Sequence, residues 1–147
     1  MITVLMGAPG AGKTTWVQAT ATDEVILSSE AVRVYKEEID IGGYMNNMRA
    51  KGLRSVRDGQ SVIVDATNTI TAHRIWWKQI AKRYDTPTRL IAFNTALPLL
   101  LAAQKTREYP AEDQIVKSHF NRFNRALLFV NYEGWGEVKI INRGISE

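Results

Sequence analysis

The stretch Gly7-Ala8-Pro9-Gly10-Ala11-Gly12-Lys13-Thr14 follows the pattern G-x-x-x-x-G-K-T, which is the phosphate-binding loop, or Walker A motif. Before it, residues 2–6 form an apolar and β-branched run that is typical of a buried strand. After it, residues 14–20 contain neither glycine nor proline and can form a helix. Strand, glycine-rich turn and helix follow one another in the order that the motif needs to bind a phosphate.

The residue types of this loop each have a chemical reason. Gly7, Gly10 and Gly12 allow backbone angles that other residues rarely adopt, and they let backbone N–H groups approach a phosphate closely. The helix that follows adds the positive end of its dipole. We expect Lys13 to reach the β- and γ-phosphates and the Thr14 hydroxyl to bind Mg²⁺. The predicted binding residues for ATP, or another NTP, are Gly7, Ala8, Pro9, Gly10, Ala11, Gly12, Lys13, Thr14 and Thr15.

Length and composition limit the remaining possibilities. The chain has 147 residues, the size of one domain, and it has no cysteine for a disulfide or a thiolate metal site. It has neither a long apolar segment nor a signal-peptide pattern, so we expect a cytoplasmic protein with no membrane partner; for a phage-encoded chain this means the host cytoplasm. The net charge of +4 weakly favours a polyanionic partner such as DNA or RNA.

Apolar runs alternate with helical segments along the chain. After the first strand, strands are expected at 25–27, 61–65, 88–94 and 138–141. Helices are expected from Glu30 to a break at Gly42-Gly43, and then at 44–57, 71–84, 98–107 and 111–130. In the helix over 71–84, the predicted buried stripe is Ala72, Trp76, Ile80 and Tyr84, with Trp77 at its edge. The order predicts an α/β fold: a three-layer P-loop NTPase domain over residues 1–147, with a five-stranded parallel sheet and a small helical lid at about 96–112.

Polar residues that follow the other strands are candidates for the same site, because ligands in such folds bind beyond the carboxyl ends of the strands. Asp65 ends an apolar strand, where a carboxylate can support Mg²⁺. Glu30 and Arg33 lie one helical turn apart after the second strand. They fit a general base with a phosphate-gripping cation, or equally a solvated ion pair worth about 0.2–0.5 kcal/mol.

Two cations precede a break at Glu108-Tyr109-Pro110. Lys105 and Arg107 can stabilise charge on a transferring phosphoryl group if the helix closes over the site as a lid. Cations also stabilise a helix C-terminus without any such role, so this alternative stays open.

These residues together resemble the 5′-kinase domain of polynucleotide kinases, both the phage type and the bacterial end-healing type. The resemblance covers nearly the whole chain. It rests on the phosphate loop, on Val25-Ile26-Leu27-Ser28-Ser29-Glu30 with Arg33 three residues later, and on the Asp65-Ala66-Thr67-Asn68 segment. Arg74, Phe93-Asn94 and a lid helix that ends in basic residues continue it.

The resemblance implies transfer of the γ-phosphate of ATP to the 5′-hydroxyl end of DNA or RNA, with Mg²⁺ as cofactor. It implies Glu30 as general base, Arg33 as the grip on the 3′-phosphate of the terminal nucleotide, and Arg107 (or else Lys105) as the lid cation. Thr67 and Arg74 match further acceptor-side positions, and Lys13, Glu30, Arg33 and Arg107 make up the implied catalytic set. The chain departs from the family in two places, because Glu30 replaces the usual Asp and Ala103 stands where a first lid arginine is expected.

Two other functions fit the same residues. A kinase of this frame can act on the hydroxyl group of a small molecule, such as a nucleoside, a sugar acid or an antibiotic. The departure at Glu30 also fits a protein that binds nucleotide or nucleic acid without transfer. The sequence favours the polynucleotide kinase, and it does not determine the oligomeric state.

Overall fold

The computed structural model describes residues 1–28 and 41–145 of the chain. Its strands are β1 (Ile2–Met6), β2 (Val25–Ser28), β3 (Val62–Asp65), β4 (Thr88–Thr95) and β5 (Glu137–Arg143). Its helices are α1 (Lys13–Thr20), α3 (Ile41–Arg57), α4 (Thr71–Arg83), α5 (Leu97–Gln104), α6 (Asp113–Leu127) and the short 3-10 helix η2 (Val130–Tyr132). Among the described residues, no helix is long and apolar enough to span a membrane.

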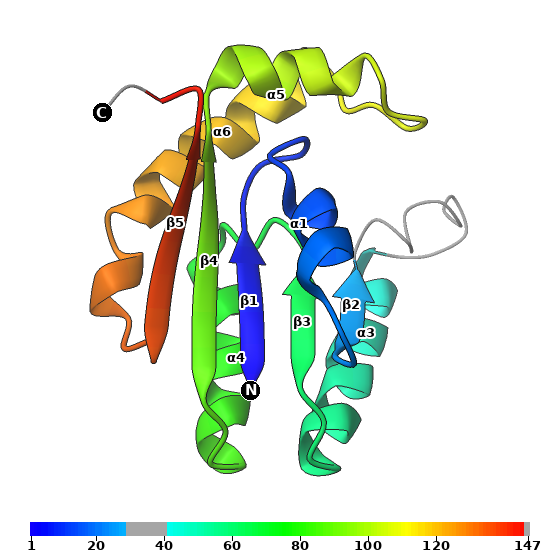
Figure 1. The fold of residues 1–147 in the computed structure, drawn as a ribbon, viewed down its shortest axis with the longest axis vertical. Helices are drawn as coiled ribbons and strands as arrows, with labels where there is room; N and C mark the ends of the chain where they lie inside the picture. Colours follow the sequence, from blue (N-terminus) through cyan, green and yellow to red (C-terminus); the bar gives the residue numbers. More distant parts are fainter. Residues whose placement is uncertain (29–40, 146–147) are drawn as a thin grey trace.

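The strands form one parallel sheet in the order β2-β3-β1-β4-β5, with all the arrows pointing the same way (Figure 1). β1 lies at the centre because its residues are buried on both faces, as expected for an apolar strand covered by two layers of helix. In the β1–β3 register, Leu5 is opposite Asp65, so the phosphate loop after β1 and the polar loop after β3 leave the same edge of the sheet. The predicted α/β fold with five parallel strands is confirmed.

Each face of the sheet has its own hydrophobic core, because alternate residues of a strand point to opposite faces. On one face, Val4 and Val64 pack with Trp77 of α4 and Phe123 of α6. On the other face, Leu5 and Ile91 pack with side chains of α1, α5 and the first half of α6. Helix α6 therefore contributes to both cores. The sheet is held rigidly between two layers, and this fixes the position of the loops at its carboxyl edge.

Some predicted helix boundaries and one predicted face were wrong. Helix α3 begins at Ile41, so Gly42-Gly43 lie within the helix and do not break it. Helix α5 ends at Gln104, before the two lid cations, and α6 covers only Asp113–Leu127 of the predicted 111–130.

The buried face of α4 also differs from the prediction. It consists of Arg74, Trp77, Ile80 and Ala81, whereas Ala72 is exposed. Trp77 is fully enclosed because Gly52 of α3 lets the indole ring approach its backbone, and a Cβ at that glycine would lie 2.5 Å from the ring. Trp77 is thus a core residue that joins α3 to α4.

Candidate functional site

The phosphate loop joins β1 to α1 at the carboxyl edge of the sheet (Figure 1). Gly10 and Gly12 have φ values of 87° and 105°, in the region that favours glycine. Gly7 does not share this geometry, contrary to the sequence-based expectation. It is needed for space, because a Cβ there would lie 3.1 Å from the Cβ atoms of Ala11 and of Phe93. The loop is thus shaped by two turns and one close approach to β4.

Lys13 lies in the first turn of α1 and is largely buried. Its Nζ donates hydrogen bonds to the carbonyl oxygens of Gly7 and Ala8 at 2.8 and 2.9 Å. These contacts hold the ammonium group against the loop that it follows. The positive charge, the loop N–H groups and the N-terminus of α1 act together on any anion bound in the loop.

Thr14, in the first turn of α1, contacts Asp65 at the end of β3. Thr14 Oγ1 donates a hydrogen bond to Asp65 Oδ2 at 3.1 Å, and the carboxylate of Asp65 is buried at the end of β3. A hydroxyl and a carboxylate oxygen are hard ligands of the kind that Mg²⁺ takes, with water and substrate phosphates completing its shell. These two residues therefore fit a Mg²⁺ ion beside the phosphate loop.

The loop after β3 is hydrogen-bonded to the phosphate loop and to the end of β1. The carbonyl oxygen of Thr67 accepts a hydrogen bond from Gly7 N at 3.0 Å. Asn68 Nδ2 donates to the carbonyl oxygen of Leu5 at 2.7 Å, and its φ of 49° is one that asparagine tolerates better than most residues. The Asp-Ala-Thr-Asn segment thus fixes the end of β1 relative to Asp65, and Thr67 lies next to the first glycine of the phosphate loop.

A cavity of ≈ 340 Å³ lies over the phosphate loop. Besides residues 10–15 of the loop and α1, it is lined by Ala103, Thr106, Arg107 and Arg143. Arg143 ends β5, and its Nη1 donates to the carbonyl oxygen of Ala11 at 3.3 Å. A Cβ at Gly12 would lie 2.8 Å from the same nitrogen, so a larger residue there would displace the end of the Arg143 side chain. Lys13, Arg107 and Arg143 surround one volume from three separate parts of the chain.

Gln104 joins the phosphate loop to the segment that follows α5. This side chain is buried, and its Nε2 donates to the carbonyl oxygen of Pro9 at 3.0 Å. Its Oε1 accepts from Ala111 N at 3.0 Å and from Arg107 Nη1 at 3.4 Å. One amide therefore holds both ends of the 105–111 turn against the loop, and Arg107 is positioned by it. The sequence analysis did not single out Gln104, because nothing in a lone glutamine within an apolar helix marks such a contact.

The structure separates the two predicted lid cations. Arg107 lines the cavity over the phosphate loop, whereas Lys105 is exposed and does not line it. Arg143, at the end of β5, lines this cavity as well. The signal for Arg143 was its place at the end of the last parallel strand, the same edge that carries the other site residues.

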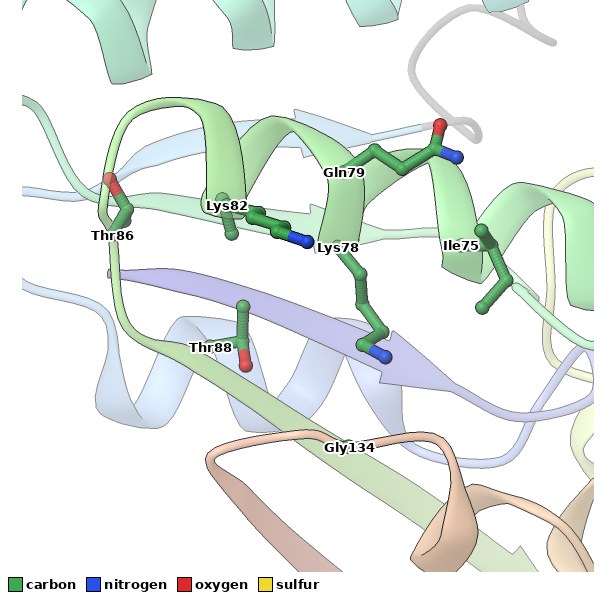
Figure 2. Close-up of a pocket in the computed structure, with 8 residues that line it drawn as sticks. Ile75, Lys78, Gln79, Lys82, Thr86, Thr88 and Gly134 are labelled. Atoms are coloured by element: carbon green, nitrogen blue, oxygen red, sulfur yellow. The ribbon is translucent and has the colours of Figure 1, made fainter.

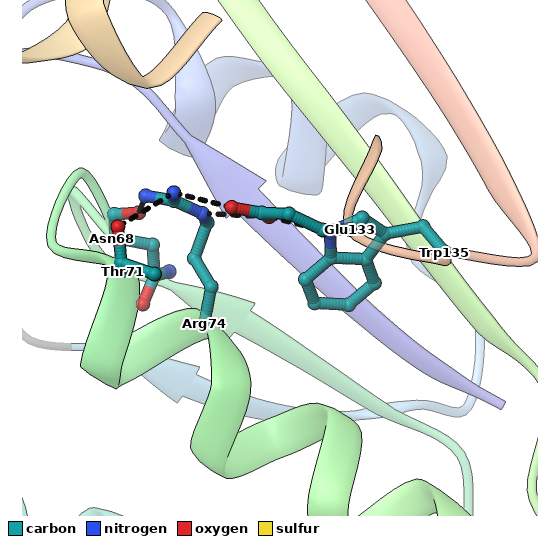
Figure 3. A network of polar contacts seen from close by, with 5 residues as sticks. All are labelled: Asn68, Thr71, Arg74, Glu133 and Trp135. Atoms are coloured by element: carbon teal, nitrogen blue, oxygen red, sulfur yellow. Dashed lines mark hydrogen bonds and ion pairs between the residues drawn. The ribbon is translucent and has the colours of Figure 1, made fainter. Parts of the chain in front are cut away.

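Arg74 does not lie where an acceptor contact requires it, and the expectation for this residue is corrected. Its side chain is completely buried, with Nη2 2.7 Å from Glu133 Oε2 and Nε 3.0 Å from Oε1 (Figure 3). Nη1 donates to the carbonyl oxygen of Asn68 at 3.2 Å. The guanidinium group thus links the loop after β3 to the segment between η2 and β5.

Glu133 completes this network. Trp135 Nε1 donates to its Oε1 at 3.0 Å (Figure 3). Burial by itself would raise the pKa of the Glu133 carboxyl, but hydrogen bonds from Arg74 and Trp135 and the charge of Arg74 outweigh burial and lower the pKa. The pair is therefore ionised and structural, and it holds the loop that carries Thr67 in place.

Glu30 and Arg33, the predicted base and acceptor grip, lie outside the described residues. The strand that leads to them, β2, ends at Ser28 and pairs with β3 so that Ser28 is opposite Asp65. The chain therefore leaves β2 at the same edge of the sheet as Asp65.

A further cavity of ≈ 390 Å³ lies at the amino-terminal edge of the sheet, between the C-terminal half of α4, the start of β4 and Gly134 (Figure 2). Lys78 and Lys82 line it together with Thr86 and Thr88. The ammonium group of Lys78 lies 5.9 Å from the centre of the Trp135 ring. This cavity is at the end of the strands opposite the phosphate loop, so it has no part in the phosphate site.

The chain is similar in sequence to a known kinase. The chain is 29% identical over 136 residues to L-seryl-tRNA(Sec) kinase of Methanococcus maripaludis, an alignment that covers 84% of this chain and 52% of that protein. It thus spans about half the length of this curated relative.

Two solved structures share the fold. A chain of the Pnkp1/Rnl/Hen1 RNA repair complex superposes with a TM-score of 0.71 at 17% identity, covering 86% of this chain and 45% of that one. A gluconokinase from Sinorhizobium meliloti 1021 superposes with a TM-score of 0.59 at 11% identity, covering 98% of this chain and 83% of that one. Residues 2–128 match the family described as AAA domain. The chain has a P-loop kinase-like fold and belongs to the AAA domain family.

Proposed function

We propose that this chain is a Mg²⁺-dependent kinase that transfers the γ-phosphate of ATP to the 5′-hydroxyl end of DNA or RNA. The observation that carries the proposal is the cavity of ≈ 340 Å³ over the phosphate loop, which Arg107 and Arg143 line together with the loop itself. Such a volume suits a triphosphate better than an uncharged ligand, because cations and backbone N–H groups surround it.

The donor half uses the contacts around the phosphate loop. Lys13, the loop N–H groups and the two arginines bind the phosphates and stabilise the charge that develops on the transferring group. Thr14 and Asp65 are the residues that would hold Mg²⁺, and a bound Mg²⁺ supplies further charge neutralisation at the phosphate oxygens. Gln104 contacts both the phosphate loop and Arg107, so it positions Arg107 beside the loop that binds the nucleotide.

The acceptor half lies across the carboxyl edge of the sheet. Thr67 is proposed as an acceptor contact, and the hydrogen bond that its carbonyl oxygen accepts from Gly7 N supports this role. Glu30 is proposed to accept the proton of the attacking 5′-hydroxyl, and Arg33 to bind the 3′-phosphate of the terminal nucleotide. Support for a nucleic-acid acceptor comes from the net charge of +4 and from similar proteins named for tRNA and for RNA repair.

A second candidate is a kinase for a small hydroxyl compound. It is favoured by the structural likeness to a gluconokinase, which covers nearly all of this chain. The two candidates share the ATP-binding part of the site and differ only in the part that binds the acceptor. A small acceptor needs an enclosed pocket, whereas a nucleic-acid strand needs an open path with cations along it.

The test offers both kinds of acceptor to one protein preparation. Purified chain is incubated with γ-labelled ATP and Mg²⁺, together with 5′-hydroxyl DNA and RNA oligonucleotides or with a nucleoside, gluconate and an aminoglycoside. Lys13→Ala serves as the inactive control. Label on the oligonucleotides supports the proposal. Label on a small acceptor but on neither oligonucleotide contradicts it and favours the second candidate.

A further inference from the structure

A third cavity, of ≈ 290 Å³, lies where the loop after β3 meets α6. Thr69 and Thr71 line one side of it, and Arg122, Arg125 and Phe129 line the other. Arg125 is exposed and Arg122 is half-buried. The residues come from two elements that the fold brings together beside the loop that supports the phosphate site.

The electrostatics of this cavity favour an anion. Helix α4 begins at Thr71 with no side-chain hydrogen bond capping it and no acidic residue in its first turn. Its N-terminal N–H groups and dipole therefore act on the cavity, and the Thr71 hydroxyl at its start accepts a hydrogen bond from Arg74 Nη2 at 3.3 Å. Arg122 and Arg125 add two guanidinium groups from α6, and among the described residues no acidic side chain lines the cavity. Arginine binds phosphate oxygens by paired hydrogen bonds, so a phosphate group suits this arrangement.

A second observation points to a ligand independently. Thr69 is 4% exposed, and its Oγ1 has no hydrogen-bond partner among the described residues. A buried hydroxyl without a partner costs about 1–3 kcal/mol. Thr69 lines the cavity, and rotation of its side chain about χ1 would let the hydroxyl donate this hydrogen bond to a phosphate oxygen bound there.

The rim of the same cavity is apolar. Phe129 and Ile70, which both line it, are 59% and 42% exposed. An exposed aromatic ring beside guanidinium groups is the combination that proteins use to stack a base and hold its backbone phosphate. Phosphate-binding and base-stacking groups thus share one surface.

The cavity lies close to the donor site along the chain. Thr67 accepts a hydrogen bond from Gly7 of the phosphate loop, and Thr69 follows two residues later. Two residues span at most about 7 Å. A nucleic-acid strand whose 5′ end lies beside Thr67 can therefore contact Thr69, Arg122 and Phe129 with the nucleotides that follow.

We propose that this cavity binds an internal phosphodiester of the acceptor strand, with the adjacent base against Phe129. This inference rests on the proposed polynucleotide kinase function and names its substrate class more closely. The preferred acceptor is a single strand several nucleotides long, and a single nucleotide is a poor one because it cannot reach the cavity. Arg122, Arg125 and Phe129 bind the strand and have no part in the transfer step itself.

The test compares a nucleoside 3′-monophosphate with a longer single-stranded 5′-hydroxyl oligonucleotide. Arg122→Ala and Arg125→Ala are measured beside Arg83→Ala, which removes the same charge at the other end of α4. We expect each cavity variant to raise KM for the long strand about tenfold, with kcat and the KM for the monophosphate unchanged. The slope of log affinity against log salt, measured by fluorescence anisotropy with the same strand, should fall by about 0.7 for each arginine removed.

Phe129→Ala provides a second variant in case an arginine variant folds poorly, because this ring is exposed. It should weaken binding of the long strand about fivefold or more and leave the salt slope unchanged. If the wild type prefers the long strand but the cavity variants have the same KM and binding as Arg83→Ala, the inference is overturned and the proposed function is not. Equal use of both acceptors by the wild type does the same. A wild type that neither binds nor phosphorylates either acceptor overturns the proposed function and the inference with it.

Discussion

Thr14 Oγ1 donates a hydrogen bond to Asp65 Oδ2 at 3.1 Å, so the first turn of α1 and the end of β3 share one contact at the carboxyl edge of the sheet. This contact brings a hydroxyl and a buried carboxylate together beside the phosphate loop, and both are oxygen ligands of the kind that Mg²⁺ takes. The other groups around the phosphate cavity lie at the same edge of the sheet.

Replacing Asp65 with Asn should raise the Mg²⁺ concentration needed for half-maximal activity. The amide keeps the size of the side chain but loses the negative charge, and losses of this kind cost about 10–100-fold in metal affinity or activity. Activity is titrated with Mg²⁺ at fixed ATP. Asp58→Asn, an exposed carboxylate at the end of α3, is the matched control. An unchanged Mg²⁺ requirement in Asp65→Asn would remove this residue from the metal site.

Arg143→Ala should impair the enzyme more than Lys105→Ala. Arg143 lines the phosphate cavity and contacts the loop, whereas Lys105 is exposed and does not line the cavity. If Arg143 stabilises the charge that develops in the transition state, its loss lowers kcat by about 10²–10³-fold. If Arg143 binds ATP equally well before and during the reaction, its loss raises KM for ATP and leaves kcat unchanged. Steady-state kinetics with ATP separate the two, and Lys139→Ala on the exposed side of β5 is the control. Equal effects in Arg143→Ala and Lys105→Ala would contradict the geometry.

Gln104→Ala should loosen the 105–111 turn and weaken ATP binding. The variant leaves the carbonyl oxygen of Pro9 and the N–H of Ala111 without their partner, which costs about 1–3 kcal/mol at buried Pro9 and less at half-buried Ala111. The free energy of unfolding and the ATP affinity are both measured. Gln104→Glu is the informative companion, because a carboxylate still accepts from Ala111 but cannot donate to Pro9. A Gln104→Glu variant with wild-type ATP affinity would show that the contact to Pro9 is unimportant.

Arg74→Ala should destabilise the fold without acting on catalysis directly. Removing the guanidinium leaves the carboxylate of Glu133 without its charge partner in a nearly buried place, and breaking such a pair costs about 3–5 kcal/mol. Urea unfolding measures the loss. Arg57→Ala, which breaks an exposed ion pair with Asp58, should cost about 1 kcal/mol or less. A similar loss in both variants would mean that the buried pair contributes little.

The same pair predicts a pH dependence of stability. The pKa of Glu133 is lower in the fold than its ordinary value of 4.5, so ionised Glu133 stabilises the protein above that value. This contribution should be lost as the pH falls below 4.5 and through the lowered pKa. Glu133→Gln should flatten the dependence of the unfolding free energy on pH in that range. Identical acid profiles for Glu133→Gln and the wild type would contradict the assignment.

The sequence was sufficient for the sheet and for the donor loop. Buried parallel strands are near-continuous apolar runs, and the phosphate loop is a local motif, so both can be recognised without tertiary information. Asp65 could be predicted because the carboxyl ends of parallel strands meet at one edge, and its contact with Thr14 agrees with that expectation.

Other residues could not be assigned from sequence because tertiary packing decides their roles. Arg74 was expected on the acceptor side, yet Glu133 lies 59 residues away along the chain and the segment before β5 brings it beside Arg74. Trp77 was misassigned because Gly52 of another helix makes room for its ring. Arg143 and Gln104 contact the phosphate loop from distant parts of the chain, and neither contact leaves a periodic or local pattern.

The most direct test of the central claim compares two forms of one oligonucleotide that differ only at the 5′ end. The wild-type chain is incubated with γ-labelled ATP and Mg²⁺, and label is followed on a 5′-hydroxyl strand and on the same strand carrying a 5′-phosphate. The account predicts that label appears on the 5′-hydroxyl strand alone, is removed by a 5′-phosphatase, and is absent with Lys13→Ala. No transfer to the 5′-hydroxyl strand by a chain that binds ATP and is fully folded would contradict it.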